Sequence, residues 1–236
     1  MRTPRTRQTE KGLTLMEALV AILMVSAVMV AISPPIFLAV ATRVQNRRAE
    51  QAIQLAHGEI DQVRVLVEGG INTENKKQLP GDAGNTDPAK VAPPGSTYKD
   101  MQSTNFECSD YDREPPKVPV PVTEARLVDV NGDCNKDFLV QTFIANTQEI
   151  DRGGDRIPII FNIGVRVYSI AAESNLGNLT VGEDGSVKAA SLKLTTGEGQ
   201  QTDRPLAVLY TTLGQGDSTG ALEKYRCLAG AGENCN

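Results

Sequence analysis

The feature of this 236-residue chain that most limits its fold is one long apolar segment near the N-terminus. From Leu13 to Ala41 the sequence reads LTLMEALVAILMVSAVMVAISPPIFLAVA, and Glu17 is the charged residue within it. Twenty such residues form a helix of roughly 30 Å, about the thickness of the hydrocarbon core of a bilayer. The sequence therefore predicts a membrane-spanning helix at 13–41.

Charged residues flank this segment on both sides. Residues 1–12 carry four basic groups and one acidic group, which favours a cytoplasmic N-terminus. Arg43, Arg47 and Arg48 nearly balance them on the far side, so charge alone indicates the orientation only weakly. The formal net charge is −5 for the whole chain and −8 for the part after Gly12. Such an acidic body argues against nucleic-acid binding, which relies on neutralising phosphates.

Three interpretations of the apolar segment compete. A secretory signal peptide would find a small-residue cleavage site at 39–41, but the apolar run is too long for one. A plain transmembrane anchor explains the length but leaves the carboxylate of Glu17 in lipid, which costs several kcal/mol near the bilayer centre and less near its edge. Cleavage between Gly12 and Leu13 would place a new terminal amine one helical turn from Glu17.

The residues GLTLME at 12–17 resemble the processing site of type IV pilins and pseudopilins. The resemblance implies that a prepilin peptidase cuts after Gly12 and methylates the amine of Leu13. It also implies that Glu17 meets the terminal amine of a neighbouring subunit, with Thr14 beside it in the assembly region, and that the helix kinks at Pro34. Leu13 departs from the phenylalanine that most members carry.

The same resemblance implies the partners and the location of the chain. These are other pilins or pseudopilins bound through the N-terminal helix, the prepilin peptidase and methyltransferase, and an inner-membrane assembly platform. The chain would cross the inner membrane once, with a cytoplasmic N-terminus and a periplasmic globular domain, and would then enter a filament. The stretch Ser33–Arg64 is further similar to cyanobacterial pseudopilins of hormogonium polysaccharide secretion, which implies a role in polysaccharide export and gliding motility.

Beyond Ala41 the pattern becomes amphipathic, so residues 42–68 are predicted to continue the same helix with one face on a core. Gly69-Gly70 is predicted to end the helix. The residues expected on the buried face recur at three- and four-residue steps: Ala49, Ala52, Ile53, Ala56, Ile60, Val63 and Val67.

The remaining chain is predicted to be a loop followed by a sheet. Residues 69–117 are rich in Gly, Pro, Asn and Asp, and are predicted to be the irregular αβ-loop that varies among pilins. Residues 118–213 hold the strand candidates, which no helical crossover interrupts. The predicted fold class is thus α+β, a long kinked helix packed on a C-terminal antiparallel sheet. The strand candidates are Glu124–Val130, Phe138–Asn146, Ile157–Ile170, Ser186–Thr195 and Leu206–Leu213.

Four cysteines permit three pairings. Cys227 and Cys235 enclose a seven-residue loop in the C-terminal region 214–236, and Cys108 and Cys134 bracket the proline-rich lead-in to the sheet. These placements favour pairing 108 with 134 and 227 with 235. Both bonds need an oxidising compartment.

The turn DVNGDCNKD at 129–137 raises the possibility of a cation site. Asp129, Asn131, Asp133 and Asp137 place oxygen atoms at alternate positions, as a calcium loop does. However, Cys134 occupies the position where such a loop has glycine, and an Asn/Asp-rich hairpin turn is the alternative interpretation. No other cofactor is expected.

No catalytic signature accompanies these features, so the chain is not expected to be an enzyme. Gly216 to Gly220 matches G-x-S-x-G, but the single histidine, His57, lies far upstream of the serine, whereas the hydrolase order needs it after. Two functions remain. One is a structural minor pilin or pseudopilin, and the alternative is a membrane-anchored extracytoplasmic module that binds a ligand through 69–117 or 129–137.

Overall fold

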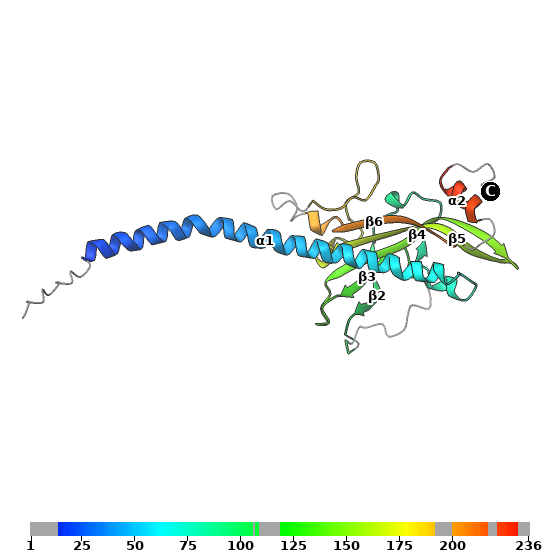
Figure 1. Cartoon of the computed structure of the whole chain (residues 1–236), viewed down its shortest axis with the longest axis horizontal. Coiled ribbons are helices and arrows are strands. Elements are labelled where there is room, and N and C mark those ends of the chain that lie inside the picture. The colour runs from blue at the N-terminus through cyan, green and yellow to red at the C-terminus, as the bar shows by residue number, and fades with distance from the viewer. Residues whose placement is uncertain (1–13, 106, 109–118, 192–199, 217–220, 231–236) are drawn as a thin grey trace, which may run out of the picture. The chain divides into compact units, whose positions relative to one another are not determined.

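The computed structural model describes residues 14–105, 107–108, 119–191, 200–216 and 221–230. The chain divides into two compact units, Met1–Val44 and Gln45–Asn236, and each is described by itself. The helix α1 (Leu15–Glu68) supplies the described part of the first unit and continues into the second (Figure 1). The single helix predicted for 13–68 is therefore confirmed from Leu15 onward.

In the first unit, α1 is bent and remains helical through Pro34 and Pro35 (Figure 1). Proline has no N–H to donate to the preceding turn, which is the ordinary cause of a bend in a helix. The large apolar side chains of this segment are exposed in the isolated chain, for example Leu15, Ile22 and Phe37. Among the described residues, α1 is the helix long and apolar enough to span a membrane.

In the second unit, α1 packs on the sheet through the predicted stripe. The first buried positions of this part of α1 are small residues, and Ala52 and Ala56 are fully buried. Their small side chains allow the helix to approach the strands closely. The prediction was wrong for Ile53, which is 44% exposed. The buried members of the stripe are Ala49, Ala52, Ala56, Ile60, Val63 and Val67.

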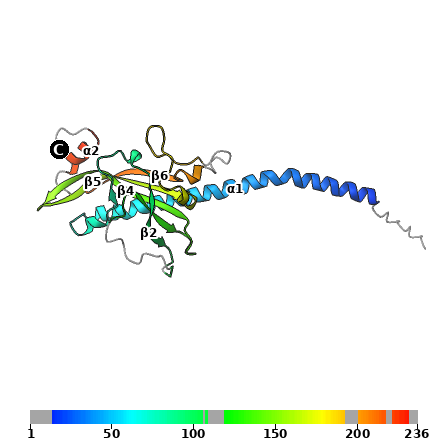
Figure 2. The same ribbon diagram turned by 180° about the vertical axis from the view of Figure 1, so that it is seen from behind.

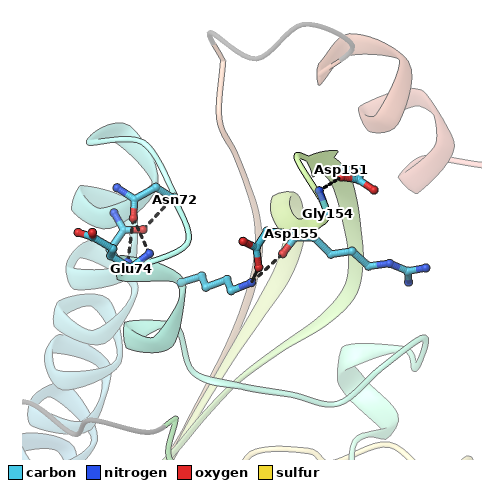
Figure 3. Close-up of polar contacts among 8 residues, drawn as sticks. Asn72, Glu74, Asp151, Gly154 and Asp155 are labelled. Carbon is cyan, nitrogen blue, oxygen red and sulfur yellow. Dashed lines mark hydrogen bonds and ion pairs between the residues drawn. The ribbon is translucent and has the colours of Figure 1, made fainter.

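Two glycines terminate α1, and an ion pair connects the segment that follows it to the sheet. Gly69 donates its N–H to the carbonyl of Val65, and Gly70 follows with a φ of +86°, a conformation that glycine adopts without steric cost. A few residues later the Nζ of Lys76 lies 3.2 Å from an Oδ1 of Asp155 (Figure 3). This contact joins the segment after the helix to a β-hairpin turn.

Six strands form a mixed sheet in the order β2-β3-β4-β5-β6, with β1 pairing with β4. The C-terminal part of α1 lies against this sheet, as Figures 1 and 2 show from opposite sides. The α+β class is thereby confirmed. The strands are β1 (Gly81–Asp82), β2 (Ser96–Ser103), β3 (Glu124–Asp129), β4 (Phe138–Arg152), β5 (Asp155–Ser169) and β6 (Ala207–Gly214).

Two features of the sheet differ from the sequence prediction. The segment 69–117 is not irregular throughout, because it contains β1, β2 and the short 3-10 helices Asn75–Gln78 and Pro88–Lys90. The sheet is not wholly antiparallel either, since β2 pairs with β3 and β1 with β4 in parallel. A parallel partner needs a return connection that local patterns do not reveal.

Near the C-terminus one predicted strand is not formed in its described part, and one helix is present. The described part of the candidate 186–195, which is 186–191, is not a strand, and the rest lies outside the described residues. Val187 and Ala190 instead bond singly to the backbone of Ala89 and Pro205. The helix α2 (Ala221–Leu228) follows β6.

The two faces of the sheet bury different kinds of side chain. On the face toward α1, alternate residues of β5 form an aliphatic and aromatic core with the helix: Phe161, Ile163, Val165 and Val167. On the opposite face, Arg166 and Gln141 are fully buried beside a second cluster that contains Tyr168 and Leu139. The period of two along each strand produces this division.

Candidate functional site

The helix α1 begins at Leu15, two residues beyond Leu13, the predicted new terminus. Thr14 caps it, because its Oγ1 accepts the backbone N–H of Glu17 at 3.3 Å and its carbonyl accepts that of Ala18 at 3.0 Å. Thr14 and Glu17 have the spacing of a capping box. Gly12 and Leu13, the predicted processing residues, lie outside the described residues.

The hydroxyl groups of the apolar segment are satisfied within the helix. Ser26 donates to the carbonyl of Ile22 and Ser33 to that of Met29, both at 2.7 Å, and Thr42 donates to the carbonyl of Leu38 at 2.8 Å. Such bonds to the preceding turn are the usual way in which serine and threonine hydroxyls are accommodated in lipid. These residues therefore need no external partner.

Glu17 is different from these hydroxyl residues. Its carboxylate makes no hydrogen bond or ion pair with any residue that the structure describes. The partial positive charge of the helix N-terminus favours a nearby carboxylate by about 0.3–1 kcal/mol, whereas an acidic side chain at the bilayer centre costs about 2.5–3.5 kcal/mol. Glu17 thus requires an additional cationic partner if it enters the membrane deeply.

The predicted pair Cys108–Cys134 is confirmed as a disulfide. It joins the loop after β2 to the acidic turn after β3, and Asn105 adds a hydrogen bond from its Nδ2 to the carbonyl of Gly132. For the second predicted pair, Cys227 is disulfide-bonded and Cys235 lies outside the described residues. The described cysteines include no free thiol.

Asp129 organises the acidic turn from a buried position. Its Oδ1 accepts the backbone N–H groups of Asn131 and Gly132, and its Oδ2 accepts the Ser103 hydroxyl at 2.7 Å and the N–H of Cys134 at 2.9 Å. Burial raises the pKa of Asp129, but these hydrogen bonds outweigh it, so the pKa lies below its ordinary value. The carboxylate therefore holds the turn together in its charged form.

The other residues of the predicted calcium set also accept backbone donors. Asn131 accepts the N–H of Asp133, Asp133 accepts that of Asn135, and Asp137 accepts that of Val130. Among the described residues, no group of three or more His, Cys, Asp or Glu side chains is placed to hold a metal ion. Calcium binding at 129–137 remains a prediction from the sequence pattern alone.

We expect Asp129→Asn to destabilise the chain and to change its response to acid. An asparagine keeps one acceptor oxygen, so one pair of donors loses its partner, at a cost of about 1–3 kcal/mol. Because the folded pKa of Asp129 is lowered, its contribution is present above about pH 4, the unfolded value, and is lost as the pH falls below it.

The measurement is denaturant unfolding of the oxidised chain at neutral pH and near pH 3. Asp129→Asn should lose less stability on acidification than the parent chain. The control is Glu183→Gln, which removes an exposed carboxylate. Equal acid sensitivity in all three proteins would show that Asp129 does not stabilise the turn as a carboxylate.

Sequence reasoning missed a cluster on the far face of the sheet. Arg166, on β5, is fully buried and has no carboxylate partner among the described residues. Its guanidinium donates to the carbonyls of Val91 and Pro88, to Gln141 Oε1 and to the Tyr210 hydroxyl. A lone arginine within the apolar run 157–170 was the available signal.

Comparison of the chain with protein-family models, curated proteins and solved structures gave no match.

Proposed function

We propose that this chain is a structural subunit of a pilin-like or pseudopilin-like filament and that it catalyses no reaction. The observation that carries the proposal is Glu17, a carboxylate without a partner among the described residues, in an apolar helical segment whose serine hydroxyls are bonded within the helix. The spacing in the sequence between Gly12 and Glu17 matches that of the pilin processing site. Cleavage there would supply a terminal amine, and a neighbouring copy would place that amine near Glu17.

The fold is compatible with this role. One helix is long and apolar enough to span a membrane, and it continues into a body in which its own second half forms part of the core. Such a chain could leave the membrane as a filament subunit without unfolding its body. The disulfide Cys108–Cys134 fits a body that folds in an oxidising compartment.

The proposal has further parts. The prepilin peptidase cuts after Gly12 and methylates Leu13, and an inner-membrane assembly platform takes up the product. The chain then awaits extraction as a single-pass protein with its body in the periplasm, and the filament supports polysaccharide secretion and gliding motility. These parts rest on the resemblance of residues 12–17 and 33–64 to pilins and pseudopilins.

The test is the intact mass of the chain purified from membranes. We expect the protein to lack residues 1–12, so that it begins at Leu13, and to carry one methyl group on the new amine. Gly12→Ala should keep the full leader, because the peptidase requires glycine before the cut. The matched control is Gly58→Ala, whose added Cβ meets no atom within 4 Å.

Two results would count against a filament subunit. One is a mature chain that starts at Thr42, after the A-x-A sequence, which would indicate a secretory signal peptide. The other is normal trimming of Gly12→Ala. Retention of Met1 in the parent chain would favour the second candidate, a membrane-anchored module that binds a ligand. A cavity between α1 and the sheet in the body favours that candidate.

A further inference from the structure

A cavity of about 120 Å³ lies within the unit Gln45–Asn236. One wall is α1, which contributes residues at helical spacing, among them Glu59, Val63 and Leu66. The opposite wall is the sheet, and the segment 77–80 closes a side. Residues three, four and seven apart share one helix face, so α1 presents a continuous surface to the cavity.

Strand pairing explains why the sheet residues converge here. Arg126 on β3 is directly opposite Val140 on β4, and side chains directly opposite one another lie on the same face of a sheet. Thr142 is two residues from Val140 and therefore shares that face. This is the face that packs against α1, as the hydrogen bond from Thr142 Oγ1 to Glu59 Oε2 at 3.1 Å confirms.

Of the three charged side chains that line the cavity, one has a hydrogen-bond partner and two have none among the described residues. The carboxylate of Glu59 has the Thr142 hydroxyl as a donor. Arg126 is a half-buried residue and Lys77 an exposed one, and both line the cavity. Neither cation makes a hydrogen bond or an ion pair with any residue that the structure describes. The lining thus carries two unneutralised positive charges against one negative charge.

A half-buried arginine whose guanidinium has no protein acceptor favours an anionic partner, because burial of the residue limits how well water can hydrate its N–H groups. Carboxylates suit it best, since they accept two parallel N–H bonds from its planar fork. The apolar wall formed by Val63, Leu66, Leu79 and Val140 suits a short hydrocarbon portion next to that carboxylate. An anion with an apolar stem would therefore satisfy both parts of the lining.

Size narrows the class of ligand. A dry engineered cavity of about 150 Å³ holds one benzene molecule, whereas drug-sized ligands occupy roughly 300–1,000 Å³. A volume of 120 Å³ accordingly admits a group of about four or five carbon atoms. We propose that the cavity binds a short-chain aliphatic carboxylate, with Arg126 and Lys77 holding the carboxylate and the apolar wall holding the chain.

The test uses the full-length chain in detergent and 3-methylbutanoate as the probe, followed by ligand-observed saturation-transfer NMR. We expect saturable binding to the parent chain. Arg126→Gln should weaken it at least about tenfold, the equivalent of about 1.4 kcal/mol. Glu59→Gln should bind as tightly or more tightly, because it removes the repelling charge and keeps an acceptor for Thr142.

Weaker binding to Arg126→Gln together with undiminished binding to Glu59→Gln separates ligand binding from a structural role, which would not distinguish the two charges in this way. Arg156→Gln is the control, because its side chain is 82% exposed and it lies at the start of β5, away from the cavity lining. The uncharged and cationic analogues 3-methylbutanol and 3-methylbutylamine should bind more weakly than the acid.

Three outcomes would overturn the proposal. They are the absence of saturable binding to the parent chain, equal binding to Arg126→Gln, and a preference for the amine. Unchanged thermal unfolding of each variant shows that the body remains folded. A normal start at Leu13 with no carboxylate binding would reject this inference and leave the filament proposal intact.

Discussion

Glu17→Gln is expected to be cleaved and inserted into the membrane normally but to be nearly absent from filaments. The substitution keeps the shape of the side chain and removes its charge. Membrane insertion becomes easier, because a neutral side chain costs less in lipid. A carboxylate and an amine about 4 Å apart attract one another by about 4 kcal/mol at an effective dielectric of 20, before desolvation is subtracted. Loss of this attraction should reduce incorporation of the chain into filaments at least about tenfold.

The measurement compares the chain in sheared filaments with the chain in the membrane fraction. Ser26→Ala is the matched control, since it removes a polar group that is already bonded within the same helix. It should enter filaments like the parent chain. Recovery of Glu17→Gln in normal amounts would contradict the idea that this carboxylate selects a neighbouring amine.

Arg166→Met is expected to lose about 3–5 kcal/mol of stability, because several acceptors lose their donor at once, and this is a large part of the typical 5–15 kcal/mol for a domain. Methionine fills much of the space but donates no hydrogen bond. The buried carbonyl of Val91 and Oε1 of Gln141 and the half-buried carbonyl of Pro88 would then lack this donor, at up to about 1–3 kcal/mol each before relaxation.

Two aromatic rings add to this effect. The guanidinium of Arg166 lies over the ring of Phe143 at 5.0 Å and over that of Tyr210 at 5.7 Å, which stabilises a buried cation. Gly164 is paired with both aromatic residues, and a Cβ there would approach the Phe143 ring to 2.4 Å. The glycine thus leaves room for the ring that the arginine covers.

Denaturant unfolding followed by near-ultraviolet circular dichroism measures the loss of stability. Arg156→Met is the control on the same strand, and it should change stability by less than about 0.5 kcal/mol because its side chain is exposed. Arg166→Lys should be intermediate, since it retains the charge but has fewer donors and no planar fork. Equal stability of Arg166→Met and Arg156→Met would show that the buried network contributes little.

Several parts of the fold were predictable because their signals are local. Hydropathy and the three- and four-residue spacing predicted α1, and Gly69-Gly70 predicted its end. Runs rich in Val, Ile, Leu, Thr and aromatic residues, bounded by turn residues, predicted β3 through β5 and, after Leu206, β6. Ile53 shows the limit of such patterns, because it fits the helical stripe and yet is exposed.

Other parts depend on contacts between distant segments. The strand β2 lies in a stretch rich in turn residues, so its local sequence does not indicate a strand. Its parallel pairing with β3 depends on the tertiary structure. The polar network of Arg166 joins β5 to carbonyls more than 70 residues away in the sequence. The predicted pair 108–134 depended on the position of the cysteines around a proline-rich stretch, which sequence could indicate but not establish.

By itself the sequence determined an N-terminal helical segment apolar enough to span a membrane, the position of the single carboxylate in that segment, and the division into helix and strands. These properties follow from composition and period along a continuous stretch of chain, so neighbouring residues suffice to specify them. Only the tertiary structure decided which strands run parallel, which arginine is buried and where Glu59 and Arg126 come to share a cavity. Those outcomes depend on the packing of segments far apart in the chain, which the residues of any one segment do not encode.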